Sequence, residues 1–215
     1  MLYFFSITYI ISLGALLTLS DHQHSSKRFW IKLLTCIHPL LILSIGLMNQ
    51  TIHTVDPRLL LALIFALLGD VALGLKHRFK RAMHLGILFF SWTHIALIAL
   101  FYEKTGFIWI LFVVSVIWLT FFNLFLRKLN LGAYTSLIAL YAFLILVMFG
   151  MAFISLIQNM DIHHFILWLG ALCFLLSDTL LSQKYFAKFK VPWVNIAYLI
   201  LYHIALSLFT LSAFV

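Results

Sequence analysis

Eight long apolar stretches constrain the fold of this chain more than any other feature of its sequence. Each holds roughly 20 mostly apolar residues, which as an α-helix is long enough to cross the ~30 Å hydrocarbon core of a bilayer. We expect helices over residues 2–19, 29–48, 58–75, 83–101, 107–126, 133–156, 163–182 and 193–215. The sequence therefore predicts an all-α membrane protein, with residues 1–215 forming a single transmembrane domain built as a bundle of eight helices.

The composition excludes several other classes of protein. Hydrophobic residues make up 65% of the 215 positions and charged residues only 9%, whereas soluble domains are roughly half apolar and a quarter charged. The net charge of +8 comes from short basic clusters between apolar stretches, which indicates a membrane surface and not a nucleic acid as the partner. The first stretch lacks the basic residue and the cleavage site of a signal peptide, so we interpret it as a helix.

Basic residues are concentrated in the loops that follow the odd-numbered helices. They are Lys27, Arg28, Lys76, Arg78, Lys80, Arg81, Arg127, Lys128, Lys184, Lys188 and Lys190. The other loops and their flanks hold only Arg58 and Lys104. The positive-inside rule places the basic loops in the cytoplasm. We therefore expect a multi-pass protein of the bacterial inner membrane with both termini on the non-cytoplasmic side.

An internal similarity relates the two halves of the chain. At an offset of 108 residues, the segment 67–70 aligns with 175–178, which pairs Asp70 with Asp178. His94 and His203 follow these two Asp residues by 24 and 25 positions. The offset equals four helices, so the sequence predicts a four-plus-four parallel internal repeat of the kind found in some transporters.

Asp70 and Asp178 are the only acidic residues within the expected spans. An ionised Asp inside a membrane costs several kcal/mol, so such residues usually face a cavity, a partner or a pathway. Each precedes a basic-loop Lys by six residues, which is roughly 9 Å along a helix. A functional pair in the cytoplasmic half of the membrane is one interpretation. The alternative is a structural ion pair of either Asp with Lys32.

The other polar residues of the spans have two interpretations each. His94 and His203 either line the same cavity as the Asp residues or act as hydrogen-bonded struts between helices. Lys32 either extends to the headgroup layer as an anchor or holds a phosphate. We expect His163 and His164 to be solvated on the far face. We interpret Cys36 and Cys173 as small buried hydrophobic residues, because no CxxC spacing suggests metal or redox chemistry.

Several short motifs resemble those of the YhhN-like family of integral membrane proteins, which includes the lysoplasmalogenases. The residues that carry the resemblance are Lys32 within 30–35, Gly69-Asp70 with Leu73, Gly86 with Phe90 and His94, Tyr141 with Met148 and Ala152, and Ser177-Asp178. The resemblance covers nearly the whole chain. It implies hydrolysis of the vinyl ether bond of a lysoplasmalogen, either lysoplasmenylethanolamine or lysoplasmenylcholine. The products are a fatty aldehyde and glycerophosphoethanolamine or glycerophosphocholine.

The chemistry of this reaction suits a pair of carboxyl groups. Hydration of an enol ether begins with protonation of its β-carbon, which needs a protonated acid and then an anion near the resulting cation. Burial and a neighbouring carboxylate both favour the protonated form of one carboxyl group, as in other carboxyl-pair enzymes. We therefore expect Asp70 and Asp178 to divide these roles, with His94 and His203 bonding to the carboxyls or positioning water.

The expected ligand is a lysophospholipid that enters from the cytoplasmic leaflet. We expect four further residues to bind it: Lys32, Tyr141, Ser177 and Tyr202. Besides this substrate we expect membrane lipids as partners, and no nucleic acid, cofactor or metal. Two alternatives remain open. One is a proton-coupled transporter or channel, and the other is a hydrolase with zinc held by Asp70, Asp178, His94 and His203.

Overall fold

A computed structural model describes residues 2–18, 25–76, 78–79, 81–105, 108–124, 135–186 and 193–215. The described residues form eight α-helices and no strand: α1 (Leu2–Thr18), α2 (Ser25–Met48), α3 (Pro57–Gly74), α4 (Ala82–Thr105), α5 (Ile108–Leu124), α6 (Thr135–Asn159), α7 (Ile162–Phe186) and α8 (Val194–Ser212). The prediction of an all-α chain is confirmed, and the predicted helix bounds lie within four residues of the observed ones.

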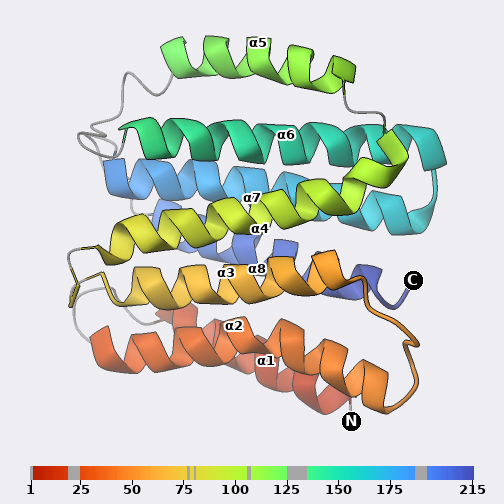
Figure 1. The fold of residues 1–215 in the computed structure, drawn as a ribbon. Helices are drawn as coiled ribbons and strands as arrows, with labels where there is room; N and C mark the ends of the chain where they lie inside the picture. The colour runs from red at the N-terminus through yellow and green to blue at the C-terminus, as the bar shows by residue number, and fades with distance from the viewer. Residues whose placement is uncertain are drawn as a thin grey trace.

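Six of the helices close into a ring. In order around the ring these are α2, α3, α4, α6, α7 and α8, which contacts α2 again. Helix α1 packs on α2, and α5 packs on α6 at the outside of the bundle (Figure 1). The six ring helices are long and apolar enough to cross a membrane, and α1 and α5 are shorter apolar helices. The chain is therefore a multi-pass membrane protein, while the number of eight spans stays a prediction.

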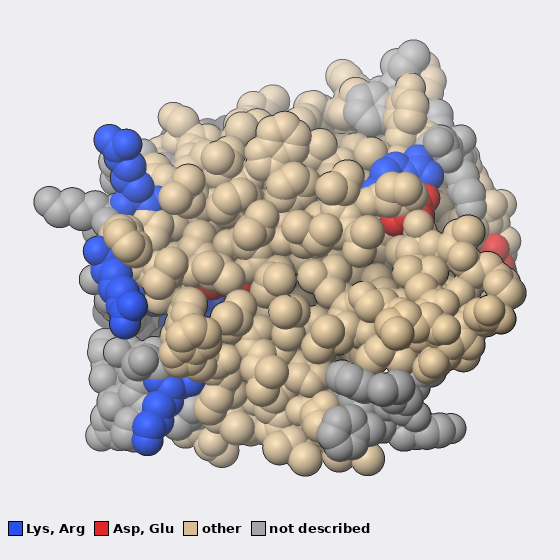
Figure 2. All heavy atoms as spheres, turned by 60° about the horizontal axis from the view of Figure 1, so that its bottom comes forward, with Lys and Arg blue, Asp and Glu red and all other residues tan. Residues whose placement is uncertain are grey.

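Successive helices alternate in direction along the bundle axis. Figure 1 shows α3 and α7 running the same way, as the proposed repeat requires, and both chain ends at one end of the bundle. Figure 2 shows most Lys and Arg side chains at the opposite end. The described basic residues of that end are Lys27, Lys76, Arg78, Arg81 and Lys184. Lys80, Arg127, Lys128, Lys188 and Lys190 lie outside the described residues.

The interior of the ring is filled by large side chains that are fully buried. These include Leu97, Phe101, Met148, Met151, Phe174 and Phe209. Large apolar side chains such as Trp109 and Phe112 are instead exposed on the outer surface. Helices that are apolar on both faces are typical of a membrane environment, where lipid covers the outward side.

Two glycines let α3 and α4 approach closely. A Cβ atom on Gly69 would lie 2.8 Å from the ring of Phe90, and one on Gly86 would lie 2.6 Å from the side chain of Leu73. The same Cβ on Gly86 would lie 3.5 Å from the carbonyl oxygen of Gly69. Small residues at such positions allow membrane helices to pack backbone against backbone.

We predict that Gly69→Ala destabilises the protein, because the added methyl group pushes against the buried Phe90 ring. Overpacking of this kind costs about 1–3 kcal/mol. Thermal unfolding in detergent should show a lower midpoint than the wild type. Gly14→Ala is the matched control, since a Cβ at Gly14 meets nothing within 4 Å. Equal midpoints for Gly69→Ala and Gly14→Ala would contradict the close packing of α3 on α4.

Candidate functional site

Asp70 on α3 lies inside the ring and receives three donors from neighbouring helices. The Lys32 ammonium group is 2.6 Å from its Oδ1 atom. The thiol of Cys36 donates to Oδ2 at 3.0 Å, and the hydroxyl of Tyr202 on α8 donates to the same oxygen. Lys32 and Cys36 are four residues apart on α2, so they lie on one face of that helix. These contacts hold a charged group that is only 4% exposed.

Asp178 on α7 has a different set of partners. The hydroxyl of Tyr141 on α6 donates to its Oδ2 atom. The Nε2 atom of His94 on α4 is 3.5 Å from the same oxygen and 3.1 Å from the Tyr141 hydroxyl. No Lys or Arg pairs with Asp178 among the described residues. The buried Nδ1 atom of His94 has no hydrogen-bond partner in the described part of the chain.

Aromatic rings connect the two carboxylate clusters. The ring of Phe174 lies 5.0 Å from that of His94 and 5.6 Å from that of Tyr202, between centroids. The Phe90 ring contacts both Phe174 and Tyr202. Each of these aromatic side chains is buried. The two Asp residues therefore share the interior of the ring, each within its own hydrogen-bond network.

His203 on α8 is buried beside the Asp70 cluster. Its Nδ1 atom is 3.1 Å from the hydroxyl of Tyr9 on α1, and its Nε2 atom has no partner among the described residues. His38 on α2 packs against the Tyr9 ring, and its Nε2 atom is 3.2 Å from the hydroxyl of Thr8. Polar groups of α1, α2 and α8 thus extend the site away from Asp70.

Residues 28–213 match the family model described as the YhhN family. The chain belongs to the YhhN family. The match includes both carboxylate clusters and all of the ring helices except the first three residues of α2. No curated protein and no solved structure matches the chain.

The site of this YhhN family member includes most of the residues predicted from the sequence. Asp70, Lys32 and Tyr202 lie together, as do Asp178, His94 and Tyr141. Ser177 differs, because its hydroxyl donates to the backbone carbonyl of Tyr198 at 2.9 Å. That bond joins α7 to α8, so the hydroxyl serves helix packing in this structure.

Three contacts of the site were missed by the sequence analysis. Cys36 is buried, as predicted, but its thiol also donates to Asp70. Its spacing of four residues from Lys32 is the signal that could have indicated this. His38 and Tyr9 carried no such signal, because their partners lie on other helices. Lys32 contacts Asp70 directly. This contact is the structural ion pair that was the alternative interpretation of the two Asp residues.

The described residues offer no evident metal site. No group of three or more His, Cys, Asp or Glu side chains among them is arranged to hold a metal ion. The zinc alternative requires Asp70, Asp178, His94 and His203 to converge on one ion. Their observed partners place Asp70 and Asp178 in separate networks.

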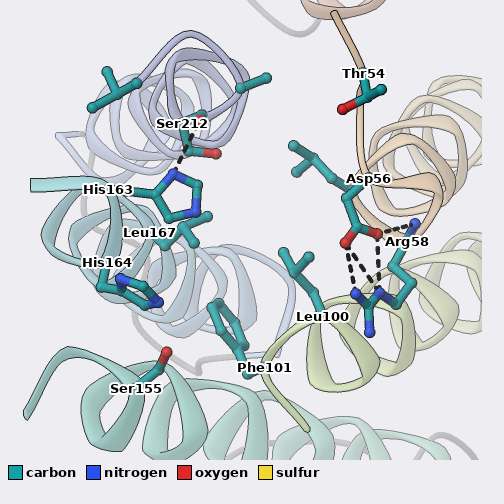
Figure 3. A pocket seen from close by; sticks show the side chains of 13 residues that line it. Thr54, Asp56, Arg58, Leu100, Phe101, Ser155, His163, His164, Leu167 and Ser212 are labelled. Atoms are coloured by element: carbon teal, nitrogen blue, oxygen red, sulfur yellow. Dashed lines mark hydrogen bonds and ion pairs between the residues drawn. The ribbon is translucent and has the colours of Figure 1, made fainter. Parts of the chain in front are cut away.

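A polar cavity lies at the other end of the ring. Figure 3 shows this cavity, of about 400 Å³, between the ends of α3, α4, α6, α7 and α8. Its polar groups bind one another: Arg58 pairs with Asp56, and the Nδ1 atom of His163 donates to the Ser212 carbonyl at 3.0 Å. The expectation that His164 is solvated is wrong, because this residue is buried beside Asp161, which caps α7.

Asp56 stabilises the start of α3 in two ways. Its carboxylate accepts a hydrogen bond from the backbone N–H of Arg58 and forms an ion pair with the Arg58 side chain. These contacts hold the pKa of Asp56 below its usual value. A lowered pKa in the folded state means that the ionised group stabilises the fold at neutral pH, and that this stabilisation is lost as the pH falls through the lowered value.

We predict that Asp56→Asn, which keeps a good N-cap, costs roughly 0.2–1 kcal/mol by removing the ion pair. Asp56→Ala should cost about 1 kcal/mol or more, because the cap is lost too. The free energy of unfolding in detergent, measured for both variants across a pH series, tests both predicted costs. The gap between wild type and Asp56→Asn should narrow once the pH falls below the ordinary Asp pKa of about 3.9, and it should close below the lowered pKa of the folded state. A gap that persists unchanged at lower pH would contradict the ionic contribution.

Proposed function

We propose that this protein is a lysoplasmalogenase, a hydrolase that cleaves the vinyl ether bond of a lysophospholipid. The observation that carries the proposal is the presence of two buried carboxyl groups with unlike partners inside one helix ring. The YhhN family, to which the chain belongs, includes the lysoplasmalogenases. The products would be a fatty aldehyde and a glycerophosphoethanolamine or glycerophosphocholine.

The unlike partners assign a different role to each carboxyl group. Asp70 forms an ion pair with a Lys ammonium group and accepts from two further donors, which are partners suited to a carboxylate anion. Asp178 contacts a hydroxyl and an imidazole and has no Lys or Arg partner among the described residues. We assign Asp178 as the acid that protonates the β-carbon of the vinyl ether. Asp70 is the anion that stabilises the resulting oxocarbenium ion.

The reaction then proceeds by addition of water to the cation. The hemiacetal that forms breaks down to the aldehyde and the free glycerol hydroxyl. The hemiacetal hydroxyl proton returns to Asp178, which restores the acid for the next turnover. Tyr141 and His94 orient the Asp178 carboxyl group through the contacts that they make with its Oδ2 atom.

Lys32 links the carboxylate to the membrane surface. Its side chain is 18% exposed, while that of Asp70 is 4% exposed. An ammonium group has three N–H donors, so one can bind Asp70 while another binds the phosphate of a lipid. A lysophospholipid that enters from the Lys-rich end would place its vinyl ether just below its glycerol, near the depth of Asp70 and Asp178. By the positive-inside rule this end faces the cytoplasm of a bacterial inner membrane.

An apolar layer argues against a channel or transporter pathway in this structure. Along α6, α7 and α8 the layer lies between the residues of the carboxylate site and those that line the polar cavity at the other end of the ring. Its members are fully or almost fully buried: Met148, Met151, Ala171, Phe174, Leu206 and Phe209. A solute would have to displace these side chains to pass from one polar region to the other. The hydrolase is therefore the better supported of the two functions.

We predict that purified protein in detergent releases a fatty aldehyde from a lysoplasmalogen. Asp178→Asn should lose at least about 100-fold in kcat, the usual contribution of a general acid. Asp70→Asn should show a loss of similar order, because the cation loses its anion. Aldehyde release is followed with a coupled aldehyde dehydrogenase.

Asp161→Asn is the matched control. Asp161 is exposed at the opposite end of α7, and Asn preserves the helix cap. Its kcat should equal that of the wild type, and all variants should show similar unfolding midpoints. No release from folded wild type, or full activity in Asp178→Asn, would refute the proposed function or the role of Asp178.

A further inference from the structure

Helix α1 lies outside the part of the chain that matches the YhhN family, yet it contacts the site. The family match begins at residue 28, and α1 ends at Thr18. Tyr9 of this helix reaches His203, which the match includes. Leu16 of α1 is fully buried and packs against Tyr198 and Leu199 of α8. Helix α1 therefore packs against the site and contributes a side chain to it.

The hydrogen bonds around Tyr9 favour one tautomer of His203. The Tyr9 hydroxyl is 3.1 Å from both the Nδ1 atom and the backbone carbonyl oxygen of His203. A carbonyl oxygen can only accept, so the single hydroxyl proton of Tyr9 satisfies that contact when it points to the carbonyl. The remaining contact then requires a proton on Nδ1, which donates to the Tyr9 oxygen. With this arrangement both short contacts of Tyr9 are hydrogen bonds. The Ser207 hydroxyl can also donate to this carbonyl, at 2.8 Å, or to the Tyr9 oxygen, at 3.3 Å, so the opposite ring nitrogen decides between the tautomers.

The opposite ring nitrogen supports the same tautomer. Nε2 of His203 is buried and has no partner among the described residues. Buried N–H groups without a partner are rarer in proteins than acceptors that lack one. With the proton on Nδ1, Nε2 is a lone-pair acceptor and no buried donor is left unsatisfied.

We propose that Tyr9 is a positioning residue that keeps the His203 proton on Nδ1, so that Nε2 accepts a proton from the attacking water. This inference rests on the proposed hydrolase function. In that reaction the water oxygen bonds to the oxocarbenium carbon while one water proton passes to Nε2. The imidazolium then gives this proton to the glycerol oxygen as the C–O bond of the hemiacetal breaks. All protons are thereby balanced, since Asp178 regains its own from the hemiacetal hydroxyl.

The tautomer can be measured without any substrate. The full-length protein is labelled with ¹⁵N-histidine in detergent, and His203 is assigned by the signal that disappears in His203→Gln. Two-dimensional ¹H–¹⁵N spectra distinguish a nitrogen that carries a proton from one that holds a lone pair. We expect a protonated Nδ1 and an unprotonated Nε2 in the wild type, and a mixture of tautomers in Tyr9→Phe.

The kinetic readout uses the same variants. Tyr9→Phe should lower kcat about tenfold with little change in KM, a fraction of the full contribution of a general base. Tyr102→Phe is the control, since Tyr102 is 56% exposed on α4, and it should change neither the spectrum nor kcat. Similar unfolding midpoints in both variants exclude a loss of folding.

The outcomes separate the two proposals. A wild-type His203 with its proton on Nε2, or a Tyr9→Phe variant with unchanged tautomer and kcat, overturns the inference even if aldehyde is released. A wild type that has the expected tautomer but releases no aldehyde overturns the hydrolase and, with it, the role of His203 as a base. The tautomer assignment itself would then stand.

Discussion

The ion pair between Lys32 and Asp70 is the interaction on which the arrangement of the site depends. A carboxylate inside a membrane protein is tolerated only when it is paired and hydrogen-bonded. Asp70 meets this requirement with donors from α2 and α8, so the charge on α3 draws three ring helices together. The same contacts hold the carboxylate in a buried position, where the proposed effect on a developing cation would be strong.

Asp178 provides the contrast that the proposed reaction uses. It lies in the same ring, and among the described residues it contacts a hydroxyl group from α6 and an imidazole from α4. Two carboxyl groups in unlike surroundings can act as acid and as stabilising anion in one reaction. The aromatic side chains between them keep the two networks separate, because the Phe174 ring has no hydrogen-bond donor and the Tyr202 hydroxyl donates to Asp70.

The sequence predicts the helices well and their neighbours poorly. Each span is apolar over its whole length, so its existence follows from bilayer thickness alone. Which helices touch does not follow, because lipid is as apolar as the protein core and the outward and inward faces look alike. The sequence therefore could not predict that α4 packs on α6 and not on its neighbour in the chain, α5. It also could not predict that Tyr9 lies beside His203. The depth of Asp70 and Asp178 in the membrane was predicted by counting residues along each helix. Their different hydrogen-bond partners are seen only in the structure.

The central claim is that an acid in the protein protonates the β-carbon of a vinyl ether, and the position of the new hydrogen tests it most directly. Wild-type protein is given a lysoplasmalogen in D₂O, and the aldehyde is analysed by mass spectrometry. The account predicts one deuterium on the carbon next to the aldehyde group, with the unlabelled aldehyde incubated in the same buffer as the control for exchange. Aldehyde that forms without deuterium at this carbon would contradict the account.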